Sequence, residues 1–410
     1  MENPKIRFKG FTKDWEQRKV TDLGEIYIGL VTTMTEHYTD KGHLLIRNSD
    51  IKDGYFEFGE NPIYLDEEFS ERNKLRMHQL GDVITVHTGD IGTSAVIGEN
   101  EVNSIGFATI VTRPNQEILD SNYFATYLNT DTHKQWAVSM ATGDGRSNYN
   151  LKDYTKLVVP IPEIEEQKKI AACIVNLNSL ITLHQRKCEQ TKKLKKYMLQ
   201  KMFPQNGAKV PEIRFYGFTY DWEQRKLIDY LEVSSEKNRD NRFTKEDVLS
   251  VSGEYGIVNQ IEFQGRSFAG ASVSNYGVVE NGDVVYTKSP LKSNPYGIIK
   301  TNKGIPGIVS TLYAVYKPKE ITDSKFVQIY FELDSRMNSY MHPLVNKGAK
   351  NDMKVSAENA LKGMVSFPKK DEQEMISLYF STIDHLITLH QRKCDELKKM
   401  KKYMLQNMFI

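Results

Sequence analysis

The sequence predicts an α+β protein built as an internal repeat, with two globular domains and two long helices that pack on each other. Two observations predict this class. The first is a duplication: residues 4–25 return at 211–232 with fifteen of the 22 aligned positions identical, and residues 180–188 return unchanged at 386–394. The second is a long helical stripe of apolar residues that closes each copy.

The repeat is uneven along the chain. The segments between the repeated boxes, about 26–160 and 233–368, share little beyond a Gly-Asp-Val tripeptide at 81–83 and 282–284. Ordinary divergence after a tandem duplication would blur boxes and inserts alike, so the pattern favours a fixed scaffold that carries two different inserts. Recent recombination in one segment is the alternative that the repeat alone leaves open.

Each insert reads as a mixed domain of about 140 residues, which is an ordinary domain size. Strand-like runs such as 83–88 and 283–287 lie between glycine turns. Helices are expected at 121–139 and at 324–341. The inserts are therefore the α+β part of the predicted fold.

The segments 163–203 and 369–409 are predicted to be the long helices. Pro162 and Pro368 stand directly before them, where the fixed φ of proline is tolerated, and neither segment contains glycine or proline. At ~1.5 Å per residue each helix extends to roughly 60 Å, which is too long for the core of a small domain and suits a spacer.

Heptad spacing of apolar residues predicts that the two helices pack on each other. The predicted packing residues are Ile174, Leu177 and Ile181 in the first helix and Phe380, Ile383 and Ile387 in the second. His184 and His390 fall on the same seam, with Cys188 and Cys394 one step further. Single polar residues on a seam usually fix register, so we favour that interpretation over a metal site.

Composition bounds the class of protein. A hydrophobic content of 39% with 26% charged residues is typical of a globular chain, and no apolar run approaches the ~20 residues that cross a bilayer. The first ten residues carry charges where a signal peptide needs an apolar core. Cys173, Cys188 and Cys394 are spaced neither for zinc nor for a disulfide framework, so we expect a reducing, cytoplasmic location.

Motifs for catalysis are absent from the sequence. It contains no G-x-x-x-x-G-K-[ST] phosphate loop, no H-E-x-x-H and no G-x-S-x-G. Asn61-Pro62-Ile63-Tyr64 is superficially similar to an amino-methyltransferase motif, but it lacks the second proline and a glycine-rich cofactor loop. We therefore expect no catalytic residue, no metal and no cofactor on this chain. The net charge of +2 neither supports nor excludes nucleic-acid binding, because a local basic stripe binds phosphates whatever the total.

The order of the repeated motifs resembles the specificity subunits of type I restriction–modification systems. Pro162-x-x-x-Glu166-Gln167, repeated as Pro368-x-x-x-Glu372-Gln373, is similar to the start of a helix in that family. The Trp-Glu-Gln-Arg-Lys boxes at 15–19 and 222–226 resemble the starts of its two target-recognition domains. The resemblance covers the whole chain and both copies.

Loops inside the first insert resemble the same family. Gly81-Asp-Val-Ile with the following Thr88-Gly89-Asp90-Ile91-Gly92, and the stretch 142–151, are similar to the family's internal strand and loops. The second half departs from the pattern, because Lys288-Ser289-Pro290 and the stretch 347–350 stand where glycine-rich loops are expected.

The resemblance implies an architecture and a set of partners. It implies target-recognition domains at 1–160 and, with a linker, at 205–368, and family helices at 161–204 and 369–410 that pair antiparallel about a pseudo-twofold axis. Each domain would read one half of a bipartite, gapped target in double-stranded DNA. Two methyltransferase subunits would supply S-adenosylmethionine chemistry on adenine, and ATP-driven restriction subunits would join them.

Candidate DNA contacts are the polar side chains that cluster on turns beside glycine. Arginine pairs with guanine, asparagine with adenine and lysine more often with phosphate. The candidates are Arg47, Asn48, Lys52, Thr88, Asp90, Arg146, Ser147, Asn148 and Asn150 in the first insert, and Tyr255, Lys288, Lys292, Ser293, Asn294, Lys347, Lys350 and Asn351 in the second. The alternative for each is an ordinary surface turn. The lysine run 192–196 is at least as compatible with a solvated helix end or a partner surface as with DNA.

Two other classes of function remain open from sequence. One is a self-contained adenine methyltransferase with two reading domains, which the missing cofactor loop argues against. The other is a coiled-coil adaptor without a DNA role. Sequence-dependent binding to a duplex distinguishes the adaptor from a reader, and affinity for S-adenosylmethionine distinguishes the enzyme.

Overall fold

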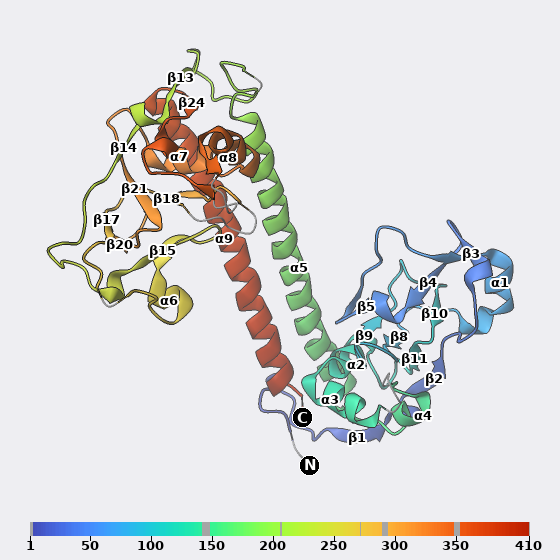
Figure 1. Cartoon of the computed structure of the whole chain (residues 1–410). Coiled ribbons are helices and arrows are strands. Elements are labelled where there is room, and N and C mark those ends of the chain that lie inside the picture. Colours follow the sequence, from blue (N-terminus) through green and yellow to red (C-terminus); the bar gives the residue numbers. More distant parts are fainter. Residues whose placement is uncertain are drawn as a thin grey trace. The chain divides into compact units, whose positions relative to one another are not determined.

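The computed structural model describes residues 3–141, 148–205, 207–270, 272–288, 294–347 and 353–409. The chain forms two compact units, which we call unit 1 (Met1–Arg186 with His390–Ile410) and unit 2 (Lys187–Leu389). The boundaries between the units fall inside two long helices, α5 (Ile164–Lys201) and α9 (Lys370–Asn407), which are seen in Figure 1. Each unit therefore contains one insert and a part of both long helices.

Unit 1 is built on two four-stranded sheets. The first is antiparallel, with the order β2 (Gly24–Ile28), β11 (Ile110–Pro114), β8 (Val83–Thr85), β9 (Ser94–Val96). The second has the order β10 (Ile105–Phe107), β4 (His43–Arg47), β7 (Tyr64–Leu65), β3 (Tyr38–Thr39), and its β10–β4 pair is parallel. Two further pairs join β5 (Ile51–Lys52) to β6 (Tyr55–Phe56) and β1 (Glu16–Lys19) to β12 (Val158–Ile161).

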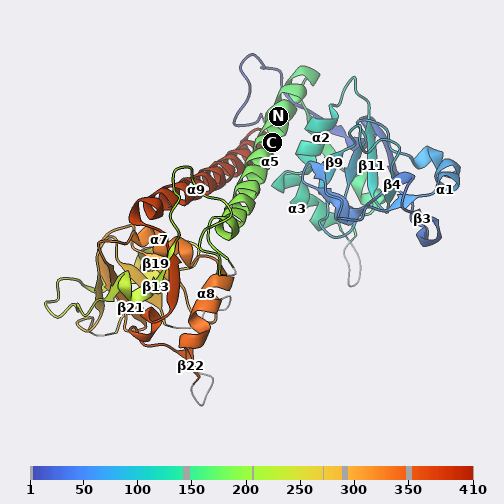
Figure 2. The same ribbon diagram turned by 90° about the horizontal axis from the view of Figure 1, so that it is seen from above.

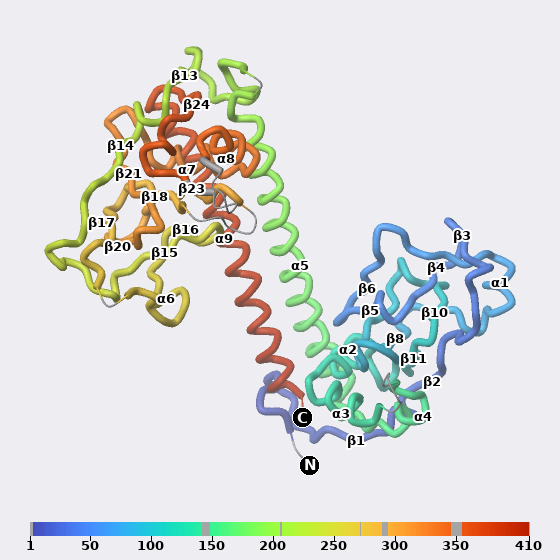
Figure 3. Tube along the Cα trace, in the orientation of Figure 1, coloured from blue at the N-terminus to red at the C-terminus, as the bar shows by residue number. Residues whose placement is uncertain are grey.

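Unit 2 repeats the first of these sheets and differs elsewhere. Its four-stranded antiparallel sheet has the order β14 (Leu231–Val233), β21 (Tyr313–Pro318), β18 (Val284–Thr287), β19 (Ile299–Thr301). Its strand pairs are β13 (Glu223–Lys226) with β24 (Met364–Phe367), β15 (Leu249–Ser252) with β16 (Gly256–Asn259), β17 (Gly277–Val279) with β20 (Gly307–Val309), and β22 (Asn346–Lys347) with β23 (Met353–Lys354). Figure 3 traces these strands along the tube.

Short helices complete both units. They are α1 (Glu67–Arg72), α2 (Ser121–Leu128), α3 (Asp131–Met140) and α4 (Leu151–Tyr154) in unit 1, and α6 (Gln260–Gln264), α7 (Ser324–Tyr330) and α8 (Asp334–Met341) in unit 2. In the view of Figure 2, α2 and α3 lie beside the β9 edge of their sheet. The single helix expected at 121–139 is wrong, because the Thr130 hydroxyl accepts a hydrogen bond from His133 N and starts a new helix there. The helix expected at 324–341 also breaks, between Tyr330 and Asp334, but there the N-cap residue Leu333 makes no side-chain cap hydrogen bond.

Aromatic side chains join each long helix to the core of a unit. In unit 1, Phe409, just beyond the end of α9, packs against Trp15, with ring centroids 6.4 Å apart, and against Tyr123. In unit 2, Phe203, just beyond the end of α5, packs against Trp222 at 5.9 Å. All five aromatic side chains are buried, and such ring pairs stabilise a core beyond their buried area. The same anchoring is thus built twice.

The Pro-x-x-x-Glu-Gln motif ties the start of each helix to its insert. Glu166 receives two hydrogen bonds from Arg7, at 2.7 and 2.8 Å, and its side chain is fully buried. The Gln167 side chain accepts from Asp120 N at 2.9 Å, at the cap of α2. In unit 2, Arg214 with Glu372 and Gln373 with Asp323 repeat these contacts. The motif therefore has a structural role in both copies.

Removing this buried carboxylate should destabilise unit 1. Glu166→Ala removes the carboxylate that balances the charge of the Arg7 guanidinium at a largely buried site, and breaking such a pair costs about 3 kcal/mol. Chemical denaturation measures the loss. Glu165→Ala is the matched control, because Glu165 forms an exposed pair with Lys168 that is worth under about 1 kcal/mol. Equal losses in the two variants would contradict the anchoring role.

The long helices pair antiparallel within each unit. In unit 1, Ile174, Leu177 and Ile181 of α5 are buried against Cys394 and Leu397 of α9. In unit 2, Cys188 Sγ lies 3.9 Å from the carbonyl oxygen of Ile387. Phe380 and Ile383 are buried in the core of unit 2, and Ile387 packs against that core.

Two equivalent histidines meet on the seam. His184 Nδ1 lies 3.1 Å from His390 Nδ1, and the two positions correspond in the repeat, since 184 + 206 = 390. Identical residues of an antiparallel pair face each other at one layer only, so this contact marks one register. The cysteines are free, and the described part of the chain contains no group of three His, Cys, Asp or Glu that could hold a metal ion. The contact between His184 and His390 supports the interpretation that these polar residues fix the register of the two helices.

Candidate nucleic-acid interface

Three of the predicted contact residues in unit 1 lie in one hydrogen-bonded cluster beyond β4 and β8. Asn48 Oδ1 accepts from His87 N at 2.7 Å, and Asn48 Nδ2 donates to the carbonyl oxygen of Ala108 at 3.2 Å. Thr88 Oγ1 donates to Asn148 Oδ1 at 2.6 Å. We call Asn48, His87, Thr88 and Asn148 the unit 1 cluster. It brings together loops that are 60 residues apart in sequence.

The proton positions in this cluster follow from its contacts. Because Thr88 uses its hydroxyl proton on Asn148, His87 Nδ1, 2.8 Å from Thr88 Oγ1, must donate to that oxygen. Burial lowers the pKa of His87, which favours the neutral ring. A neutral ring with its proton on Nδ1 has Nε2 as an acceptor. The cluster thus combines an imidazole acceptor with an asparagine amide, the group that pairs with adenine.

Other predicted residues of unit 1 hold the turns that carry them. Arg47 forms two hydrogen bonds with Asp50, at 2.9 and 3.0 Å, and this bonding raises the pKa of Arg47. Lys52 Nζ donates to the carbonyl oxygen of Ser49 at 2.8 Å, and Asp90 accepts from Thr93 Oγ1 at 2.6 Å. The carbonyl oxygen of Asn150 accepts from Tyr154 N at the start of α4. These contacts give the residues a role in local structure beside any contact with DNA.

In unit 2, the corresponding place is basic. Lys288 is the first residue after β18. It corresponds to His87, which is the second residue after β8. Burial lowers the pKa of Lys288, and the nearby positive charge of Lys237 lowers it further. Tyr255 is exposed at the β15–β16 turn, 5.4 Å from the ring of Phe263. The unit 1 cluster and the Lys288 site therefore present different chemistry.

The remaining predictions for unit 2 are only partly placed. Asn294 begins a turn in which its carbonyl oxygen accepts from Gly297 N at 3.0 Å, and Lys347 is in β22. The other predicted residues lie outside the described residues and stay predictions: Arg146, Ser147, Lys292, Ser293, Lys350 and Asn351.

Sequence reasoning missed His87 and Lys237. A strand was expected to run from 83 to 88, but β8 ends at Thr85, where Val86 N begins to donate to Thr93 O across a turn. Because position 87 lies inside the predicted strand, His87 is interpreted from sequence as an ordinary strand residue and not as a loop residue. Lys237 lies far from Lys288 in sequence, and only the fold brings their charges together.

Comparison with known proteins shows which family the chain resembles. Residues 12–193 match the model for the type I restriction modification DNA specificity domain. The type I restriction enzyme MjaX specificity subunit of Methanocaldococcus jannaschii is 24% identical over 96% of this chain and 92% of its own length. The EcoBI specificity subunit of Escherichia coli is 26% identical over 32% of this chain and 28% of its own length. The crystal structure of the S subunit of a type I restriction–modification system from M. genitalium, 14% identical, matches all of this chain and 99% of that one with a TM-score of 0.63.

Two α+β units that share a pair of long helices define the fold class, and this fold is similar to that of the M. genitalium S subunit. Residues 12–193 thus carry the DNA specificity domain of type I restriction–modification systems, and nearly the whole chain is similar to a type I specificity subunit; its role is DNA recognition. Within the described part of the chain, no helix is both long and apolar enough to cross a membrane.

Proposed function

We propose that each unit reads one half of a bipartite, gapped DNA target and that the chain performs no chemistry of its own. The observation that carries the proposal is the contrast between scaffold and loops. The Arg–Glu, Gln–backbone and Trp–Phe contacts recur in both units, whereas the unit 1 cluster and the Lys288 site differ. A scaffold that occurs twice and carries different polar loops is suited to the recognition of a different DNA sequence by each unit.

The chemistry of the loops supports base contacts in unit 1 and phosphate contacts in unit 2. The amide of Asn148 and the imidazole of His87 are donors and acceptors of the kind that read base edges. The positive charge of Lys237 acts on Lys288, and two lysine charges that influence each other in this way attract phosphate. In the proposed complex, in the cytoplasm, partner methyltransferase subunits bring S-adenosylmethionine to adenine, and restriction subunits bring ATP.

Sequencing of the methylome tests this function. Cells that express the chain with its methyltransferase partner should carry methyladenine in one two-part motif with an unread gap. The purified chain alone should transfer no methyl group to the same DNA. Methylation by the chain alone would favour the self-contained enzyme, and an unmethylated genome together with equal binding to all duplexes would favour the adaptor.

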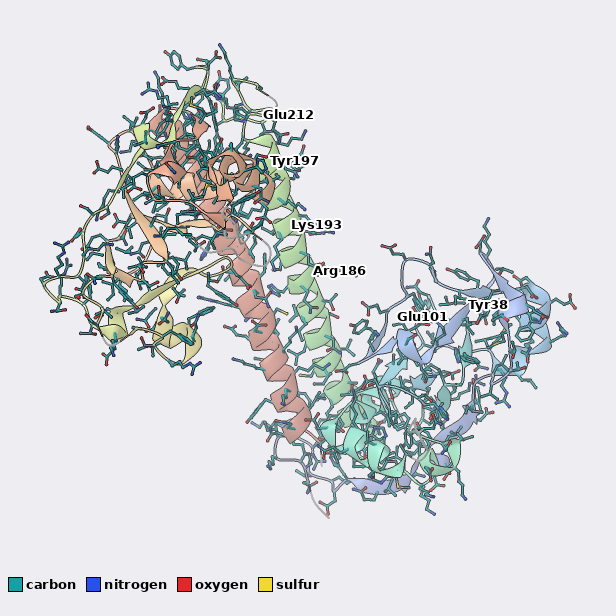
Figure 4. All side chains as sticks on the ribbon, viewed as in Figure 1. Tyr38, Glu101, Arg186, Lys193, Tyr197 and Glu212 are labelled. Carbon is teal, nitrogen blue, oxygen red and sulfur yellow. The ribbon has the colours of Figure 1, made fainter. Side chains whose placement is uncertain are left out.

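A second apolar stripe on the long helices supports docking of two partners. Leu180 and Leu183 of α5 are 43% and 45% exposed, and Leu386 and Leu389, their equivalents on α9, are 40% and 50% exposed. Tyr197, labelled on α5 in Figure 4, is exposed like its equivalent Tyr403. The seam residues do not account for this stripe. Because the stripe occurs once per copy, we assign it to an apolar helix of the methyltransferase subunit, which binds twice.

A charge placed in either stripe should remove one partner. Leu183→Glu should yield a complex with one methyltransferase copy, Leu389→Glu should do the same, and the double variant should bind none, because desolvating a carboxylate in an apolar contact is costly. Native mass spectrometry counts the copies. Val138→Glu is the control, since Val138 is an exposed apolar residue on α3. Two bound copies in the double variant would place the docking surface elsewhere.

A further inference from the structure

Unit 1 contains a ligand-sized pocket of about 490 Å³ between its insert and its part of the long helices. The wall consists of Asp53 in the turn between β5 and β6, Tyr55 at the start of β6, the start of α3, one side of α5 and the end of α9. Figure 3 shows the β5–β6 turn beside α5. Pockets that bind small ligands have volumes of roughly 300–1,000 Å³.

The charges that line this pocket are mainly positive. Four lysines face it: Lys134, Lys398, Lys401 and Lys402. Lys401 Nζ is paired with Asp53 at 2.9 Å, and the second carboxylate in the wall is that of Asp131, which is exposed. Lys398 and Lys402 are exposed to solvent at the rim. The pocket therefore has more ammonium than carboxylate groups.

Unit 2 shows how the equivalent lysine is neutralised. Lys195 corresponds to Lys401 in the repeat, and its Nζ is held by Glu332 at 2.5 Å and by Asp384 at 2.6 Å. Lys300 and Lys303 also lie within range of these two carboxylates. At this place in unit 2, two carboxylates therefore offset much of the positive charge of three lysines.

Both carboxylates of that cluster are amides in unit 1. Asp384 corresponds to Asn178, since 384 − 206 = 178. Glu332 corresponds to Asn129 when the helix caps Asp323 and Asp120 are aligned, since 323 − 120 = 203 and 332 − 203 = 129. Asn129 and Asn178 both line the pocket. Two changes from acid to amide at one place favour an anion there, because they remove the charges that would repel it.

We propose that this pocket binds the phosphate groups of a nucleotide, either a free nucleotide or one in a DNA strand. Lys398 and Lys402 would contact the phosphates, and Asn178, where unit 2 has an aspartate, would add no negative charge to the wall. Tyr55 is 56% exposed on the same wall and offers a ring on which a base can stack. For the DNA source, the inference rests on the proposed function; for a free nucleotide it does not.

Titration calorimetry on the full chain, with pyrophosphate, ATP and a short duplex as separate probes, tests the proposal. Lys398→Ala/Lys402→Ala should weaken binding by about tenfold or more, because each lost lysine removes a charge-assisted hydrogen bond. Asn178→Asp should weaken it as well, since it restores the acid found at Asp384, and its melting temperature should stay unchanged. Tyr55→Ala should weaken the binding of ATP and leave the binding of pyrophosphate unchanged.

The matched control is Lys192→Ala/Lys196→Ala, which changes the equivalent helix positions in unit 2. It should leave ATP and pyrophosphate binding unchanged. A second outcome is that ATP and pyrophosphate do not bind the wild type, while Lys398→Ala/Lys402→Ala and Asn178→Asp weaken binding of the duplex and reduce the salt dependence of that binding. In that case DNA is the source of the phosphate. If no probe distinguishes these variants from the wild type and the control, the proposal is overturned. A two-part methylated motif in the same variants would show that DNA reading itself is intact.

Discussion

Replacing residues 26–160 with the insert of another specificity subunit is expected to change one half of the methylated motif and to leave the other half unchanged. The reason is that the DNA contacts proposed for unit 1 lie inside the replaced segment, whereas those proposed for unit 2 do not. Each mismatched base pair costs ~1–3 kcal/mol, so methylation of the original target should fall by about a thousandfold or more when several pairs change.

The structure sets one condition on this exchange. Tyr123 lies inside the replaced segment and packs against Trp15 and Phe409, which stay. A donor with an aromatic residue at this position keeps the core of unit 1 closed, and a melting curve confirms it. The reciprocal exchange of residues 233–368 is the matched control, and it should change the other half-site only. A change in both half-sites after a single exchange would contradict separate reading.

The long helices were predictable because their signals are local and redundant. The expected segments 163–203 and 369–409 agree with α5 and α9 within two residues at each end. A proline before each helix, acidic first turns and uninterrupted apolar spacing all indicate the same element. The break at Thr130 was missed because one capping hydroxyl outweighs the continuous helical pattern around it.

The candidate site was less predictable because its residues act through tertiary partners. Arginine is a residue type that often contacts bases, but the guanidinium of Arg47 is hydrogen-bonded to Asp50. The lysines at the end of α9 have the sequence pattern that is typical of a solvent-exposed helix end. They line a pocket only because the turn at Asp53, 348 residues away, packs against Lys401. A single sequence does not reveal such a pairing.

The antiparallel pairing of the helices also predicts that their length sets the gap between the half-sites. A heptad inserted after His184 and a second one after His390 preserves the contacts on both sides, such as Ile181 with Cys394 in unit 1 and Cys188 with Ile387 in unit 2. Each insertion adds ~10 Å at ~1.5 Å per residue. Since the duplex rises by ~3.4 Å per base pair, the unread gap should grow by up to about three pairs.

Methylome sequencing of cells with the lengthened chain measures the gap directly. The two half-site sequences should stay the same, because neither insert changes. A variant with the heptad in α5 alone is the control, and it should lose activity because the contacts of both units can no longer form together: with Ile181 still against Cys394 in unit 1, Cys188 is displaced by seven residues from Ile387 in unit 2. An active chain with both heptads and the original gap would contradict the spacer role and would leave partner docking as the function of the helices.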